Sequence, residues 1–122
     1  MRQLRRVMTN TELLDIIRFL KTTARKNNAE IWETAAEHLS RPRRARAILN
    51  LNHVARLTKA DSLVLIPGKL LGSGEIKHAV KIGAFQYSTS ARAKVERAGG
   101  ECMALKDFVA RYPKGSNVRL VK

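Results

Sequence analysis

Residues 62–68 read Ser-Leu-Val-Leu-Ile-Pro-Gly, a short apolar run closed by a proline and a glycine. Such a run is typical of a buried strand that ends in a turn. Further strands are predicted over 79–87 and 101–104, and short helical patterns alternate with the strands after residue 45. This alternation predicts an α/β domain.

The segments on either side of this run fit the same class. A strand over 45–51 precedes a short helix that Asn52 is expected to cap. Ser88 or Ser90 is expected to cap a helix that ends at Gly99-Gly100, since glycine is the usual residue just past a helix end. The chain closes with a helix over 105–112, which Pro113 stops, and a strand over 118–121.

A helical hairpin is predicted ahead of the α/β body. Thr9 and Glu12 have the spacing of a capping box at the start of its first helix. Asn28 is expected to cap the second helix, which Pro42 prevents from continuing. The predicted organisation is a basic arm over 1–8 and a single domain over 9–122, made of a hairpin over 9–40 and a body over 45–122.

The charge balance narrows the class of partner. The chain has 122 residues, with 24 lysines and arginines against 10 acids, for a formal net charge of +14. Such a charge on so small a body repels itself unless a polyanion neutralises it. Its 44% hydrophobic content supports a packed core. The sequence therefore predicts a folded nucleic-acid-binding protein.

The positive charge is concentrated in acid-free blocks, and these supply most of the candidate RNA-binding residues; the glycine loop supplies Lys69, Gly72 and Ser73. The densest block is the arginine turn, residues 41–46, where arginine forks can bind phosphates in pairs of hydrogen bonds. A solvated basic linker is the alternative. The candidates are Arg41, Arg43, Arg44, Arg46, Arg56, Lys69, Gly72, Ser73, Lys77, Lys81, Arg92, Lys114, Ser116, Asn117 and Arg119.

Two of the candidate segments are turns with an open interpretation. The glycine loop, residues 68–74, could let RNA phosphates approach its backbone or Lys69, or it could be a tight turn between two buried strands. It lacks the Walker pattern. The C-terminal turn, residues 114–117, has turn chemistry and could meet phosphate or sugar, or merely connect two elements.

Catalytic and metal-binding patterns are missing from the sequence. His38, His53 and His78 are far apart and show no ligand spacing with Cys102, which is expected to be a buried apolar residue. We therefore expect no enzyme activity, no cofactor, no metal and no small-molecule substrate. No apolar run approaches the length of a membrane-spanning helix, so a soluble, cytoplasmic protein without a membrane partner is expected.

A helix-turn-helix DNA-binding protein is the alternative, because the two predicted helices are joined by a short turn. These helices hold half of the acids, and the expected reading helix, residues 30–39, has no lysine or arginine. This distribution favours contacts with folded RNA backbone over one helix in a DNA groove.

Four segments together resemble a known family. Residues 27–32, 39–46, 64–75 and 112–119, in this order and spacing, resemble the archaeal and eukaryotic large-subunit ribosomal protein family L-eighteen-e, which is related to bacterial ribosomal protein L-fifteen. The resemblance covers about residues 9–121. The chain lacks the longer basic extension of eukaryotic members, so it resembles the archaeal form.

The resemblance implies a structural constituent of the large ribosomal subunit that binds ribosomal RNA beside neighbouring ribosomal proteins. It also implies an α/β domain of irregular strand–strand–helix units. The family's basic turn falls on Arg41 to Arg46, its glycine loop on Gly68 to Gly74, and its C-terminal turn on Lys114 to Arg119.

Overall fold

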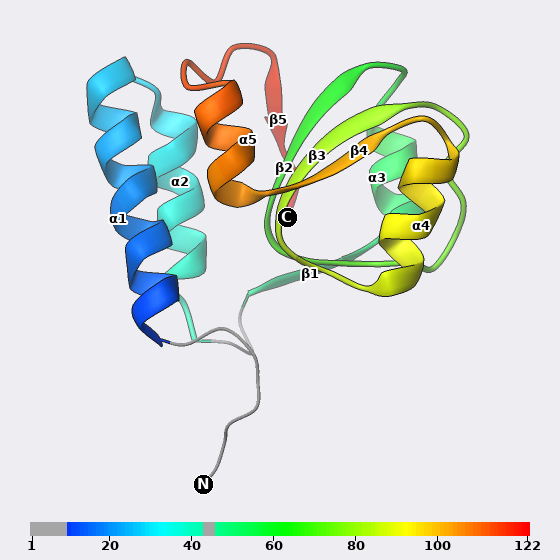
Figure 1. Cartoon of the computed structure of the whole chain (residues 1–122), viewed down its shortest axis with the longest axis horizontal. Helices are drawn as coiled ribbons and strands as arrows, with labels where there is room; N and C mark the ends of the chain where they lie inside the picture. Colours follow the sequence, from blue (N-terminus) through cyan, green and yellow to red (C-terminus); the bar gives the residue numbers. More distant parts are fainter. Residues whose placement is uncertain (1–9, 43–45) are drawn as a thin grey trace, which may run out of the picture.

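A pair of helices precedes an alternation of strands and helices (Figure 1). The computed structural model describes residues 10–42 and 46–122. Within these residues the helices are α1 (Asn10–Asn27), α2 (Glu30–Leu39), α3 (Leu51–Leu57), α4 (Thr89–Arg97) and α5 (Leu105–Arg111). The strands are β1 (Ala47–Asn50), β2 (Ser62–Leu71), β3 (Val80–Tyr87), β4 (Glu101–Ala104) and β5 (Val118–Leu120). The predicted α/β class with an N-terminal helical hairpin is confirmed.

The hairpin turns at Asn28, which has a role other than the predicted one. Asn28 has a φ of 52°, a left-handed conformation that ends α1, and asparagine tolerates it. The amide of Ala29 donates to the Ala24 carbonyl at 2.9 Å, which completes the end of that helix. The prediction that Asn28 caps the second helix is wrong, because Ala29 takes that position. Thr9 lies outside the described residues.

The sheet is parallel, with the order β1-β2-β3-β4 and β5 also paired to β2. Since β3 occupies one edge of β2, both β1 and β5 use the other edge. Residues 63–65 of β2 pair with β5, and residues 68–71 pair with β1. The central strand therefore carries two short neighbours in succession.

The predicted end of the central strand at Pro67-Gly68 is wrong. The strand continues to Leu71, and its register shifts between Ile66 and Lys69. Proline lacks a backbone donor, so it is tolerated at such an irregularity without ending the strand. A Cβ atom at Gly68 would collide with the Ala47 carbonyl, so glycine there allows β1 to approach β2.

The capping residues predicted for α4 are confirmed, and the one predicted for α3 is not. Ser88 caps α4 as predicted, because its hydroxyl accepts from the Ala91 amide at 3.2 Å. Gly99, with a φ of 90°, follows the end of the same helix. The prediction that Asn52 caps α3 is wrong, because Asn50 holds the capping position. The Asn52 amide instead donates to the Ser73 carbonyl at 3.1 Å.

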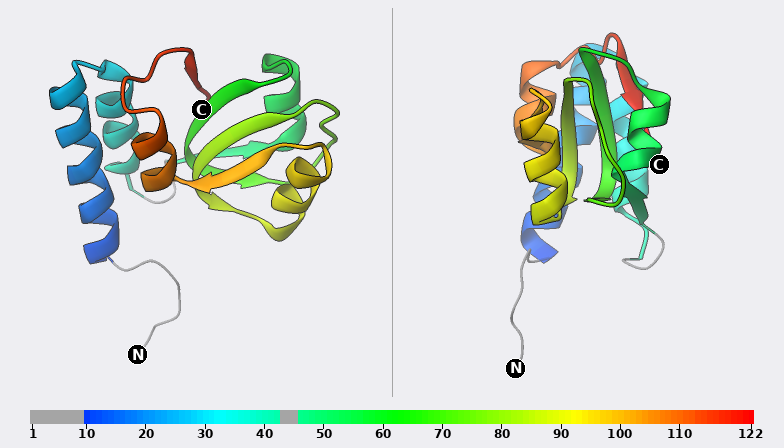
Figure 2. Two further views of the ribbon diagram at one scale, coloured as in Figure 1. Left: turned by 45° about the horizontal axis from the view of Figure 1, so that its top comes forward. Right: turned by 90° about the vertical axis from the view of Figure 1, so that its right-hand side faces the viewer.

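Helices cover both faces of the sheet (Figure 2). One apolar core joins α1, α2 and α5 to one face, with Trp32 and Phe108 fully buried in it. The other core joins α3 and α4 to the opposite face around Val64 and Ile82. The sheet is thus held from both sides, which fixes the ends of its strands relative to one another.

Candidate nucleic-acid interface

The two described ends of the arginine turn lie close together. Arg46 Nε donates a hydrogen bond to the Arg41 carbonyl at 3.3 Å, and Arg41 is exposed. Arg43 and Arg44 lie outside the described residues. The guanidinium of Arg46 lies over the Phe85 ring, 5.6 Å from its centroid. The turn therefore begins and ends beside the sheet, with Arg46 held against an aromatic side chain.

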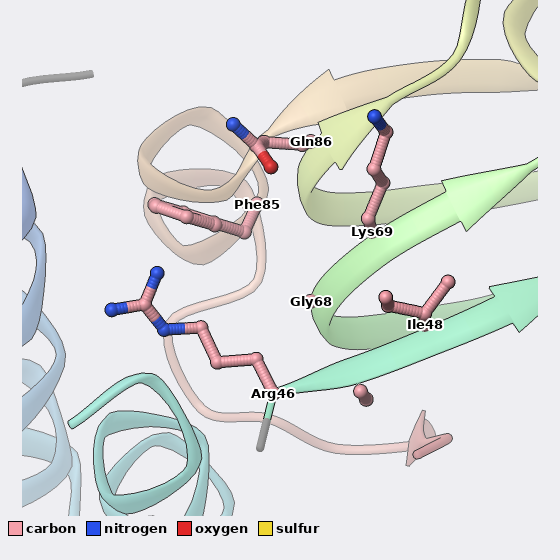
Figure 3. Close-up of a pocket in the computed structure, with 7 residues that line it drawn as sticks. Arg46, Ile48, Gly68, Lys69, Phe85 and Gln86 are labelled. Atoms are coloured by element: carbon pink, nitrogen blue, oxygen red, sulfur yellow. The ribbon is translucent and has the colours of Figure 1, made fainter. Parts of the chain in front are cut away.

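Arg46 is one wall of an open hollow at the end of the sheet (Figure 3). The hollow has a volume of about 230 Å³. Lys69 of β2 and Gln86 of β3 are register partners, and their side chains line it together with Phe85 and Ile48. Ile48 is 62% exposed, so the hollow has one apolar wall open to solvent.

A second hollow of about 310 Å³ adjoins the first. The two share Lys69, Phe85 and Gln86, and the second extends to Arg92 of α4. We call the combined surface the sheet-end basin, and define it by Arg46, Ile48, Gly68, Lys69, Phe85, Gln86, Tyr87 and Arg92. Three predicted RNA-binding residues, Arg46, Lys69 and Arg92, meet in it although they lie far apart in the sequence.

Tyr87 fixes the far side of the sheet-end basin. Its hydroxyl donates to the Met103 carbonyl at 2.6 Å and accepts from the Ala84 amide at 3.0 Å. Burial raises the pKa of Tyr87 above its ordinary value, so this phenol stays protonated. The guanidinium of Arg92 lies 4.9 Å from the centroid of the held ring. Arg92 is thus exposed but positioned.

The glycine loop is packed against the protein itself. Lys94 Nζ donates to the carbonyls of Gly72 and Gly74 at 2.8 and 2.7 Å. A Cβ atom at Gly72 would collide with the Ser90 side chain, and Gly74 has a φ of 96°. Internal packing therefore accounts for both glycines. The exposed Ser73 stays a predicted RNA contact, as does Gly72.

The C-terminal turn is anchored to the helical hairpin. The indole Nε1 of Trp32 donates to the Pro113 carbonyl at 2.8 Å. Gly115 has a φ of 68°, and a Cβ atom there would press on Ile31 at 2.7 Å. The predicted contact residues of this segment are exposed: Lys114, Ser116, Asn117 and Arg119. Lys114, Ser116 and Asn117 are displayed on this anchored turn, and Arg119 lies on β5, which follows it directly.

The remaining candidates lie apart from the sheet-end basin. Arg56 is exposed on α3, and Lys77 lines a separate hollow with Lys94 and Arg97. Lys81 is half-buried, and its register partner across the sheet is Glu101. The structure therefore distributes the predicted positions over several surfaces.

Two residues that line these hollows are not among the candidates predicted from the sequence. Gln86 lines both hollows of the sheet-end basin but carries no charge, so a search for acid-free basic blocks passes over it. Arg97 follows Glu96 directly, which places it outside those blocks. Only the spatial arrangement identifies either residue as part of a basic surface.

The described residues lack a candidate metal site, and His38 is the buried histidine among them. Within residues 10–42 and 46–122, no three or more His, Cys, Asp or Glu side chains lie together in a way that could hold a metal ion. Burial, then the neighbouring Arg41 and Lys122, lower the pKa of His38. Its Nε2 lies 3.4 Å from Lys122 Nζ, so the neutral ring can accept that donor.

Cys102 is half-buried, whereas the sequence predicts a buried residue. Burial raises the pKa of its thiol to about 11. We expect iodoacetamide at pH 8 to modify the folded protein about tenfold more slowly than the urea-unfolded chain. A smaller thiolate fraction causes this difference, and the greater nucleophilicity of a more basic thiolate offsets part of it. Mass spectrometry over time measures both rates. Equal rates would contradict the partial burial of the thiol.

Comparison with known proteins identifies the family. A family model described as "Ribosomal protein 60S L18 and 50S L18e" matches residues 2–122. The chain belongs to this family. It is 41% identical to the "Large ribosomal subunit protein eL18" of Pyrobaculum aerophilum over 113 residues, which cover 93% of each chain. The protein of the same description from Methanothermobacter thermautotrophicus is 40% identical over 114 residues, which cover 93% of this chain and 94% of that protein.

Membership in this ribosomal protein family confirms the predicted resemblance and the predicted function as a structural constituent of the large ribosomal subunit. It also confirms the expected location in the ribosome, in the cytoplasm. The family is one of structural proteins. None of these comparisons supports the helix-turn-helix alternative. Separately, no helix in the described part of the chain is long and apolar enough to span a bilayer.

Proposed function

We propose that this ribosomal protein binds large-subunit ribosomal RNA through phosphate-backbone contacts at separated basic surfaces. The first surface is the arginine turn together with the sheet-end basin, which share Arg46, and the second is the C-terminal turn. Arginine and lysine contacts to phosphate supply affinity without reading sequence, so specificity would come from the shape of the folded RNA. The rigid body of the protein would hold RNA segments at fixed separations.

The sheet-end basin is the observation that carries this proposal. Arg46, Lys69 and Arg92 come from three different elements, and no acid is among the described residues that line its two hollows. A folded protein tolerates such a concentration of like charge most easily when a polyanion neutralises it. The segment after Pro113, which Trp32 anchors, adds a second basic surface near the C-terminus. Its exposed cations are Lys114 and Arg119.

The acidic face of α2 is proposed to face away from the RNA. Glu30, Glu33 and Glu37 are all exposed on α2, which has neither lysine nor arginine. Phosphate would be repelled from this face, whereas a neighbouring ribosomal protein or solvent would not be. We also propose that residues 9–122 form a single folding unit, with 1–8 as a basic arm.

The C-terminal turn provides the test of the proposal. Replacing Lys114 and Arg119 by glutamine should reduce the magnitude of the slope of log affinity against log salt by roughly 1.4–1.8, since each lost phosphate contact removes about 0.7–0.9. The measurement is binding of the purified chain to large-subunit ribosomal RNA over a series of salt concentrations. Circular dichroism confirms that the variant is folded.

A matched variant controls for net charge. Lys59 and Lys106 are exposed and lie outside the proposed surfaces, so their replacement by glutamine removes the same charge. We expect this control to keep the slope of the unaltered protein. An unchanged slope in the turn variant, or an equal reduction in the control, would count against localised phosphate contacts. Equal affinity for a DNA duplex would count against RNA as the ligand.

A further inference from the structure

The sheet-end basin offers groups that a phosphate does not need. Ile48 exposes an apolar side chain, Phe85 presents a ring beneath Arg46, and Gln86 brings an amide. Within residues 10–42 and 46–122, the side chains of Gln86 and Lys69 have no hydrogen-bond partner. Their polar groups are therefore available to a ligand. A surface built only to neutralise phosphates would need neither the apolar wall nor the amide.

These groups match the chemistry of an unpaired nucleotide. Unstacked bases of RNA stack on aromatic rings and on arginine guanidinium planes, and their edges accept and donate hydrogen bonds. The Arg46–Phe85 pair provides the stacking surface, and an amide such as Gln86 both donates and accepts. Lys69 provides a cation next to Gln86, because the two are register partners on the neighbouring strands β2 and β3.

The size and shape of the hollow favour one unit of a longer chain. Its volume of about 230 Å³ is below the roughly 300–1,000 Å³ of sites that enclose a whole small molecule. The adjoining hollow continues to Arg92, which gives the flanking backbone a second cation to meet. A single-stranded segment could thus place one base in the first hollow while its phosphates run past Lys69 and Arg92.

We propose that the sheet-end basin binds one unpaired nucleotide of single-stranded RNA. Its base stacks on the Arg46–Phe85 pair, its base edge bonds to Gln86, and an adjacent phosphate lies on Lys69. This inference rests on the proposed function, because it assigns a ligand class to one of the RNA-binding surfaces. It goes beyond that function in requiring recognition of a base and not of backbone alone.

The test compares two probes with the same backbone charge. These are a short single-stranded RNA oligonucleotide and an abasic oligonucleotide of the same length, each bound to the full chain. We expect the base-bearing probe to bind about five- to 100-fold more tightly, as stacking of one base on a protein side chain typically gives. Equal affinities for the two probes would overturn the proposal, while salt-dependent binding to ribosomal RNA would still stand.

Charge-conserving and charge-removing variants separate stacking from neutralisation. Arg46→Lys keeps the charge but loses the guanidinium plane, so we expect the affinity ratio of the two probes to fall toward one with the salt slope unchanged. Lys69→Gln is the matched control, because it should reduce the slope and leave the ratio intact. A ratio that survives in Arg46→Lys and also in Phe85→Leu, with both variants folded, would overturn the stacking assignment.

Gln86→Ala tests the edge contact separately. Probes of uniform sequence, one for each of the four bases, rank the base preference of the hollow. We expect the affinity ratio between the best and the worst of these probes to fall by up to about tenfold in the variant. The probes should still bind, because a lost hydrogen bond leaves stacking in place. A ranking identical to that of the unaltered protein would remove Gln86 from the site.

Discussion

Replacing Arg41, Arg43 and Arg44 together by glutamine is expected to weaken binding to large-subunit ribosomal RNA about 100- to 500-fold at 0.1 M salt. Three lost phosphate contacts, each removing about 0.7–0.9 from the log–log salt slope, give this range. Arg41 is exposed at one described end of the turn. The effect should shrink as salt rises, because the lost term is electrostatic. A salt series of binding isotherms measures both the affinity and the slope.

Three basic residues of α1 give a matched control for this variant. Lys21, Arg25 and Lys26 are exposed on α1 and lie outside the proposed RNA-binding surfaces. Their replacement by glutamine removes the same three charges, so we expect a change of affinity of less than about tenfold, as for distant screened charges. Losses of equal size in the two triple variants would mean that net charge, and not the turn, governs binding.

Truncating Phe108 to alanine is expected to cost about 3–5 kcal/mol of the free energy of unfolding. The ring is fully buried between the sheet and the hairpin. It meets Trp32 edge-on at 6.3 Å and Tyr112 at 5.1 Å between ring centroids. Its Cβ and Cγ lie so close to Gly83 that a Cβ atom there would collide with them. Truncation therefore leaves a cavity where α5 packs against α2 and β3.

Urea unfolding followed by tryptophan fluorescence measures this loss, because Trp32 is the chain's only tryptophan and touches the site. Phe108→Leu is the control, and it should cost less than the alanine variant because it refills most of the volume. A loss below about 1 kcal/mol for the alanine variant would contradict the packing of α5 between the hairpin and the sheet.

The strands were predictable where hydrophobic pattern and turn residues agree. The strand over 79–87 and the strand over 101–104 are found within one residue of their predicted bounds. Pro67-Gly68 gave a misleading signal, because a bulge in the central strand uses the same residues as a turn. Asn28 and Asn52 misled for a related reason: a short polar side chain suits a helix start, a left-handed helix end and an exposed first turn.

The basic residues of the interface were visible in the sequence, but their meeting was not. Arg46 lies near Lys69 because β1 pairs with the second half of β2, beyond the bulge. Arg92 joins them because it lies in the first turn of α4, directly after β3. Long-range strand register decides both placements, and single-sequence patterns do not encode it. The same register makes Gln86 part of the surface.

Sedimentation of a cell lysate on a sucrose gradient at moderate salt tests whether the basic surfaces hold this chain in the large ribosomal subunit. We expect the unaltered protein to comigrate with large subunits, and the Arg41, Arg43 and Arg44 triple variant to shift toward the slowly sedimenting fractions. Recovery of the unaltered protein in the slow fractions alone, with none in the large subunits, would show that the chain is not bound there.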